Sequence, residues 1–211
     1  MNMKEKILEM IQGNGGYITT EQLNKHKINR YYLTELVKEK KICRISRGYY
    51  TKHDGFADNF YIKLSKCKKA VFSDATALYF YDLSDRNPIK YDIAVPYGYG
   101  NCYKNDKNVI LHYIKPENIE LGLTFLESPF GIKIRVYDVE RTICDIIKNR
   151  KKMDPEIFSK ALQRYSMLRD KDLNKLMKYA KILKVDKKVR EYMEILLWYK
   201  INVYKNIDYT Y

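Results

Sequence analysis

Residues 29–51 read NRYYLTELVKEKKICRISRGYYT and decide the fold of the N-terminal part. Asn29 is a favourable N-cap and the apolar residues after it recur at helical spacing, so we expect a helix from Arg30 to about Lys40. The apolar face of this helix comprises Leu33, Leu36 and Val37. Residues 42–51 then alternate, turn at Arg47-Gly48 and return with aromatic and β-branched residues, which predicts a β-hairpin.

Two more helices are expected before this stretch. Residues 3–12 carry apolar side chains at helical spacing, and the glycines of residues 13–16 end that pattern. Residues 17–18 are an extended link, and Thr19 with Gln22 forms a capping box that opens a short helix ending near His26. Three short helices followed by a hairpin with an arginine tip are typical of a winged helix-turn-helix. Protein-docking winged helices share this layout, so that alternative stays open.

In a DNA-binding winged helix, the third helix enters the major groove and the wing lies along phosphates. The residues that we expect to contact DNA are Thr19, Thr20, Asn29, Arg30, Tyr31, Thr34, Lys38, Arg44 and Arg47. Glu35 also faces outward and would repel phosphates. It must therefore pair with a cation such as Lys38 or accept a hydrogen bond from a cytosine amino group.

The composition fits a globular protein that meets a polyanion. The chain has 211 residues, 45% of them hydrophobic, and a formal net charge of +14. Residues 1–52 carry a net charge of +6, residues 53–150 of +1 and residues 151–211 of +7. Such basic ends suit nucleic acid, although for the C-terminal end a solubilising surface is the stronger explanation. No membrane-spanning segment or signal peptide is recognisable, so we expect a cytoplasmic protein.

The rest of the chain predicts a second, larger domain. We expect residues 53–58 to be a linker and residues 59–211 to form a domain with strands to about residue 137 and helices over 138–205. Strands followed by a run of helices indicate an α+β fold with a small mixed sheet. The alternative to a separable domain is that Phe56, Phe60 and Tyr61 pack against the winged helix.

Catalysis is not expected. The best candidate is Asp138-x-Glu140-Arg141-x-x-x-Asp145, whose carboxylates could hold Mg²⁺ in a metal-dependent nuclease. A structural role explains this segment better: Asp138 caps a helix, Glu140 favours its N-terminal dipole, and Arg141 pairs with Asp145. The four cysteines and three histidines show no metal-ligand spacing, so neither a metal nor another cofactor is expected.

Several motifs together resemble the AbiEi family of antitoxins, which belong to type IV toxin–antitoxin systems of abortive infection. The N-terminal motifs are Gly16-Tyr17-Ile18-Thr19, Leu23, Leu33, Leu36-Val37 and residues 44–50. The later motifs are Ser73, Ala75, Ala77-Leu78, residues 83–88 (LSDRNP), Val95-Pro96 and residues 136–145 (VYDVERTICD). The likeness covers about residues 5–150. Asp82 departs from it, because such proteins often carry glycine before Leu83.

The resemblance implies a function that composition could not show. It implies that the N-terminal domain represses its own operon by binding inverted repeats in promoter DNA, and that the larger domain counters a nucleotidyltransferase-type toxin in phage defence. The antitoxin and toxin need not form a stable complex. A transcription factor without a toxin partner is the remaining alternative.

Overall fold

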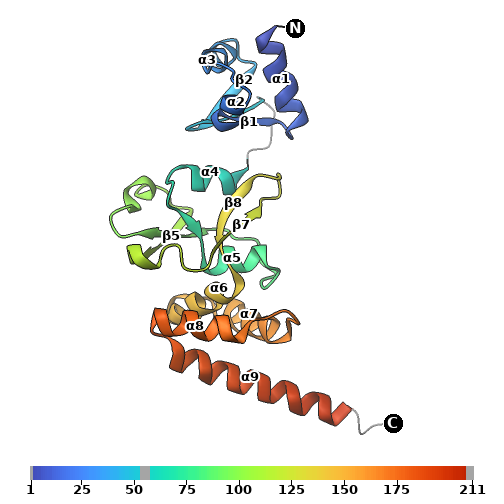
Figure 1. Ribbon diagram of the computed structural model, residues 1–211, viewed down its shortest axis with the longest axis vertical. Coiled ribbons are helices and arrows are strands. Elements are labelled where there is room, and N and C mark those ends of the chain that lie inside the picture. Colours follow the sequence, from blue (N-terminus) through green and yellow to red (C-terminus); the bar gives the residue numbers. More distant parts are fainter. Residues whose placement is uncertain (1, 53–57, 208–211) are drawn as a thin grey trace. The chain divides into compact units, whose positions relative to one another are not determined.

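The structure, a computed structural model, describes residues 2–52 and 58–207 and has the predicted α+β fold (Figure 1). The chain divides into two compact units. The smaller unit contains residues 1–68 and 127–134, and the larger unit contains residues 69–126 and 135–211. Of the predicted linker, only Asp58 lies among the described residues. No helix in the described ranges is long and apolar enough to cross a membrane.

A winged helix-turn-helix forms most of the smaller unit. Its elements are α1 (Met3–Gly13), β1 (Tyr17–Thr19), α2 (Thr20–Lys25), α3 (Tyr31–Lys38), β2 (Ile42–Ser46) and β3 (Tyr49–Lys52). The strand order is β1-β3-β2, so the residues expected as an extended link form a strand beside the hairpin. The three helices and the sheet share one core, which includes Ile7, Ile11, Ile18, Leu23, Leu33, Leu36 and Ile42.

Helix α3 is shorter than predicted at both ends. It begins at Tyr31, where the Asn29 side chain caps the first turn by accepting a hydrogen bond from the Tyr31 N–H at 2.9 Å. It ends at Lys38 because the backbone of Lys40 turns into the left-handed region, with φ +55°. The predicted apolar face is confirmed, since Leu33 and Leu36 are buried.

The smaller unit also contains elements outside the winged helix. Helix α4 (Asn59–Ser65) and the turn at residues 127–134 also belong to it. Tyr49 stacks on Tyr17 with ring centroids 5.4 Å apart and contacts Tyr61 of α4 at 5.0 Å, and Ile132 joins this cluster. Tyr61 thus makes the contact with the winged helix that the sequence left open, while the predicted domain boundary stays a prediction.

The larger unit is built on a five-stranded sheet in the order β6-β5-β4-β8-β7. The strands are β4 (Val71–Phe72), β5 (Tyr91–Pro96), β6 (Val109–Ile114), β7 (Leu123–Glu127) and β8 (Lys133–Tyr137). The sheet is mixed, as predicted: β4 pairs antiparallel with β5 and parallel with β8, and β5 pairs parallel with β6. Helix α5 (Asp74–Phe80) lies between β4 and β5 in the chain and packs on β5.

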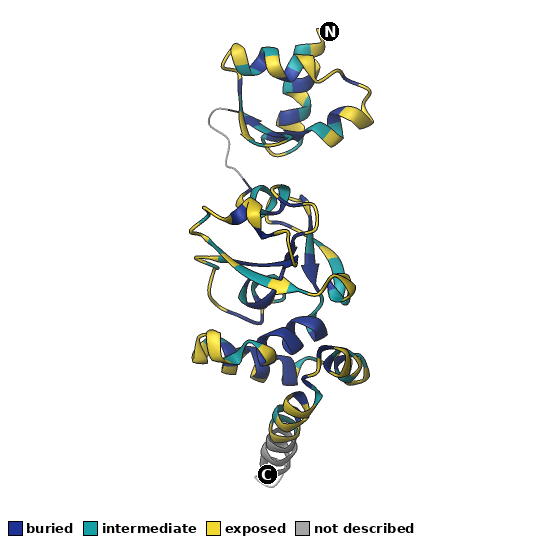
Figure 2. Cartoon of the chain, turned by 90° about the vertical axis from the view of Figure 1, so that its left-hand side faces the viewer, coloured by how far each residue is buried: buried dark blue, intermediate teal, exposed yellow. Residues whose placement is uncertain are grey.

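The predicted helical run follows the sheet. It consists of α6 (Val139–Lys148), α7 (Pro155–Met167), α8 (Leu173–Leu183) and α9 (Asp186–Ile207). Asp138, Asp154 and Asp172 cap the first three helices by accepting backbone N–H bonds. Helix α6 lies between the sheet and α7–α8 (Figure 1) and is buried over almost its whole length (Figure 2), because it packs on α5 and on α7, α8 and α9.

Candidate nucleic-acid interface

Helix α3 presents an exposed polar face opposite its buried leucines. The residues Arg30, Tyr31, Thr34 and Lys38 are all exposed, and their three- and four-residue spacing puts them on one side of the helix. Tyr31 is 59% exposed, and its ring lies edge-on to Tyr32 with centroids 5.8 Å apart. Arg30 stands immediately before the first turn, where a winged helix meets base edges or phosphate.

The acidic residue on this helix is neutralised within the domain. The Glu35 carboxylate lies 3.3 Å from Lys38 Nζ and 3.9 Å from Lys4 Nζ, so it forms the ion pair that the sequence suggested. Lys4 also pairs with Glu39, and hydrogen bonds from Lys4 and Lys41 lower the pKa of the Glu39 carboxyl group. These pairs remove much of the repulsion that the two glutamates would exert on a phosphate.

The hairpin carries the two wing arginines where the sequence placed them. Arg44 is exposed on β2, and its Nε donates to the Ser46 carbonyl at 3.3 Å. Arg47 is exposed at the turn between β2 and β3. A bulge between Arg44 and Ser46 shifts the register of the hairpin at this point. Both arginines are therefore available to phosphate oxygens.

The two threonines at the start of α2, Thr19 and Thr20, differ in burial and in hydrogen bonding. Thr19 is buried and its hydroxyl accepts the Gln22 N–H at 3.2 Å, while the Gln22 side chain accepts the Thr19 N–H at 2.8 Å. The predicted capping box is therefore confirmed, and the side chain of Thr19 is occupied by it. Thr20 is half-buried and its N–H donates to the Gly48 carbonyl at 2.9 Å, which ties α2 to the wing turn.

The structure thus brings most of the predicted contact residues to the surface of one small unit. Arg30, Tyr31, Thr34, Lys38, Arg44 and Arg47 are exposed, together with Asn29, whereas Thr19 is not. The side chain at each of these exposed positions carries a hydrogen-bond donor of the kind that contacts phosphates or base edges, and Tyr31 adds an aromatic ring.

The carboxylates proposed for a nuclease have structural partners. Asp138 caps α6 through the Arg141 N–H at 2.8 Å, and the fully buried Arg141 donates to Asp145 at 2.9 Å. Glu140 accepts the Asp172 N–H at 3.1 Å and lies 3.1 Å from Lys175 Nζ. The predicted cap at Asp138 and the predicted pair of Arg141 with Asp145 are confirmed. Among the described residues, no group of three or more His, Cys, Asp or Glu side chains is placed to hold a metal ion.

One polar group of the larger unit was not predicted. His112 of β6 lies between Asp92 and Asp74, with its Nε2 2.7 Å from Asp92 and its Nδ1 3.5 Å from Asp74. Burial by itself lowers the pKa of His112, but the two carboxylates outweigh it and raise that pKa to about 9. Asn149 donates to Asp74 at 2.7 Å. These residues are widely separated in the chain, so no sequence spacing could have revealed them.

Comparison with known proteins agrees with the N-terminal geometry. Residues 5–51 match the family model described as "Transcriptional regulator, AbiEi antitoxin", which confirms the resemblance for the winged helix-turn-helix. The RV2827C protein from Mycobacterium tuberculosis has a similar crystal structure, with a TM-score of 0.51 and 12% sequence identity over 85% of this chain and 71% of that one. This likeness concerns the fold alone. No curated protein matches the sequence.

Proposed function

We infer that the chain is a DNA-binding transcriptional regulator of the AbiEi antitoxin type, which represses its own promoter and counters a nucleotidyltransferase-type toxin in the cytoplasm. The observation that carries the first part is the exposed surface of α3 and the wing, on the segment that matches the family model. Net charge supports it, since residues 1–52 carry 11 basic and 5 acidic side chains.

The two parts of the interface have different roles. Arg30, Tyr31 and Thr34 read base edges in the major groove of double-stranded promoter DNA, where a recognition helix exposes its N-terminal residues. Arg44 and Arg47 contact phosphates of the adjacent backbone, which fixes orientation without reading sequence. The first turn of α2, with Thr20, supplies further phosphate contacts, and Thr19 acts by capping that turn.

The antitoxin role belongs to the larger domain. It has its own five-stranded sheet and its own helical core. No stable complex with the toxin is required if the domain acts on the toxin's target or product. A regulator without a toxin partner remains the second candidate.

A reporter experiment tests both parts. The upstream region of the chain's own gene drives a reporter, and the cognate toxin is expressed separately. We expect the full chain to repress the reporter and to protect cells, and the Arg30→Ala/Arg47→Ala variant to lose repression while it still protects. Lys6→Ala/Lys25→Ala, which removes the same charge from exposed positions of α1 and α2, is the control and should repress. Full reporter expression with the wild-type chain would contradict the repressor role. Death of cells that express the toxin together with the wild-type chain would contradict the antitoxin role.

A further inference from the structure

The larger unit contains a cavity that DNA binding does not use. Its volume is about 460 Å³, within the range of about 300–1,000 Å³ that small-molecule sites occupy. The residues that line it come from α5 and the loop after it, from β5 and β6, and from the segment that leads into α7. The loop contributes Ser84, Arg86, Asn87 and Pro88, which belong to a motif that the proposed function leaves unexplained.

One wall of the cavity is polar and buried. It consists of Asp74, Asp92, His112 and Asn149, and we call it the polar wall. Asp74 is 2% exposed, and one of its carboxylate oxygens, Oδ2, makes no hydrogen bond within the described part of the chain. That oxygen faces His112 Nδ1 at 3.5 Å, which is an ion-pair distance.

The backbone at Asp74 is also strained. Its φ of +43° lies in the left-handed region, which is uncommon for every residue except glycine, although aspartate adopts it more readily than most. A strained backbone costs stability, a buried carboxylate oxygen that has an ion-pair partner but no hydrogen bond is uncommon, and both features concentrate at functional sites. The polar wall therefore has the properties of a site that receives hydrogen-bond donors from a ligand.

Apolar side chains complete the enclosure. Ile89 and Ile110 line the cavity and are 92% and 44% exposed, respectively. Large aliphatic side chains this exposed gain stability when a flat apolar surface covers them. A planar ring that lies against Ile89 and Ile110 would supply that surface.

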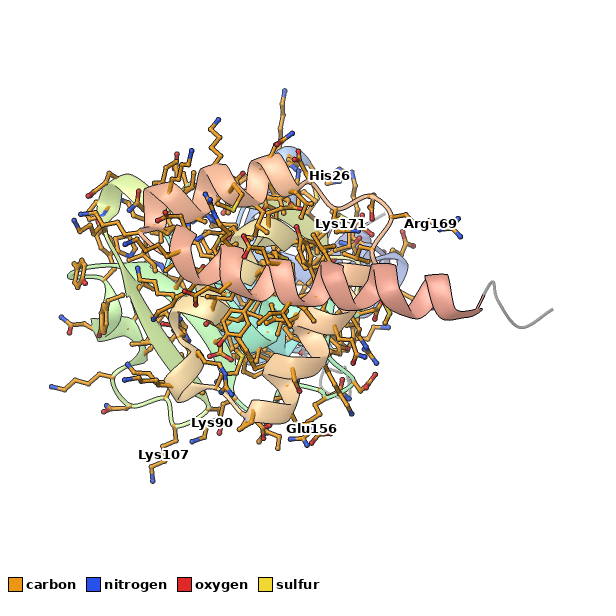
Figure 3. All side chains as sticks on the ribbon, turned by 90° about the horizontal axis from the view of Figure 1, so that it is seen from below. His26, Lys90, Lys107, Glu156, Arg169 and Lys171 are labelled. Atoms are coloured by element: carbon orange, nitrogen blue, oxygen red, sulfur yellow. The ribbon has the colours of Figure 1, made fainter. Side chains whose placement is uncertain are left out.

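Two cations beside the cavity are available to an anion. Lys90 and Lys152 line it and are exposed, and neither forms an ion pair with an acidic side chain in residues 2–52 or 58–207. Figure 3 shows Lys90 extending away from the ribbon. Arg86 differs, because it is already paired with Asp154 at 3.2 Å and with Glu156. The two lysines therefore leave positive charge for a phosphate group.

We propose that this cavity binds a free nucleotide whose base carries an amino group. The base lies against Ile89 and Ile110, its amino group donates to the Asp74 carboxylate, and its phosphates meet Lys90 and Lys152. A sugar phosphate would leave the apolar wall uncovered, and an inorganic anion would use neither that wall nor the carboxylate. All these residues belong to the larger unit, so the assignment does not rest on DNA binding or on toxin neutralisation.

Calorimetry on the full chain with CTP and UTP tests the assignment. The two ligands carry the same phosphates and differ in the amino group of cytosine against the carbonyl of uracil. We expect CTP to bind about tenfold more tightly than UTP, because the carbonyl cannot donate to Asp74. Asp74→Asn, which keeps a residue that tolerates the positive φ, should abolish the difference between the two nucleotides. Equal binding of CTP, UTP and inorganic tripolyphosphate, or no binding of CTP, would overturn the proposal.

Surface variants test the other two contacts without disturbing the core. Lys90→Ala/Lys152→Ala should weaken CTP binding about tenfold, and Lys104→Ala/Lys115→Ala, which removes the same charge from exposed lysines outside the cavity, should not. Ile89→Ser should weaken CTP binding, whereas Ile195→Ser, at a 67% exposed position of α9, should leave the affinity for CTP unchanged. Equal losses in a variant and its control would contradict the site. Promoter binding by the same variants should stay at the wild-type level, which separates this result from a failure of the proposed function.

Discussion

Arg30 and Arg47 carry the same charge, but we expect Arg30 to contact base edges and Arg47 to contact phosphates. Arg30 precedes the first turn of α3, and Arg47 stands at the tip of the wing. We expect Arg47→Ala to weaken binding to promoter and random DNA alike, because a phosphate contact reads no sequence. Arg30→Ala should also reduce discrimination between the two DNAs, by about 1–3 kcal/mol for a lost base contact. Fluorescence anisotropy on both DNAs measures these effects, and the same loss of discrimination in both variants would contradict the assignment.

His112 links stability to pH. Asp74 and Asp92 raise its pKa from 6.5 to about 9 in the folded chain, although burial acts in the opposite direction. The stabilisation from the raised pKa is present in full below pH 6.5 and is lost as the pH rises through 9, and it amounts to about 3 kcal/mol. Chemical denaturation between pH 6 and pH 9.5 should therefore show a falling free energy of unfolding for the larger unit. His112→Gln should remove that slope, and an unchanged slope in this variant would contradict the ion-pair account.

At the scale of elements, the wing turn and α2 depend on one glycine. Gly48 has φ +78°, and a Cβ built on it would lie 2.7 Å from Thr20 Oγ1. Gly131 has a similar φ of +72° with open space around it, so it is a matched control within the same unit. We expect Gly48→Ala to cost about 2–4 kcal/mol, since backbone strain and crowding add, and Gly131→Ala about 1–2 kcal/mol from strain alone. Urea denaturation compares them. Equal costs would show that the contact with Thr20 contributes nothing.

The elements that local sequence determines were predictable. The capping box at Thr19, the apolar face of α3 and the hairpin around Gly48 follow from spacing within about four residues, and so do the N-caps at Asp138 and Asp154. The end of α3 was placed about two residues too far along because the left-handed backbone at Lys40 leaves no compositional mark.

Features made by distant residues could not be read from the sequence. Strand β1 exists because residues 17–19 pair with residues 49–51, and three residues carry no period of their own. The contact of Tyr61 with Tyr49 and the group around His112 likewise depend on how the strands and helices pack. The carboxylate segment at α6 was interpretable because Arg141 and Asp145 are four residues apart on one helix.

At the scale of the whole molecule, the smaller unit extends beyond the winged helix. Asp58 is fully buried, caps α4 through the Tyr61 N–H at 3.1 Å and accepts a hydrogen bond from Ser128 at 2.5 Å. A cut between residues 52 and 59 would therefore strip cover from Tyr17 and Tyr49 and leave Tyr61 and Ile132 exposed.

This arrangement favours point variants over truncation for separating repression from neutralisation. We expect a fragment of residues 60–211 to protect cells only if the exposed cluster does not cause aggregation. Asp58→Ala in the full chain should lower the stability of the smaller unit by about 1–3 kcal/mol, because it leaves Ser128 without its acceptor and α4 without its cap. Asp54→Ala is the control on the predicted linker. Identical unfolding of the two variants would show that α4 is not part of the smaller folding unit.

The most direct test of DNA reading by the winged helix is a salt titration of binding. The full chain is titrated on DNA from its own upstream region and on shuffled DNA of the same composition. We expect tighter binding to the upstream DNA, with affinity that falls linearly in a log–log plot against salt, and a slope that decreases by about 1.8 in the Arg44→Ala/Arg47→Ala variant, since each phosphate contact contributes about 0.9. Equal affinity for both DNAs, or a slope that the double variant leaves unchanged, would contradict the account.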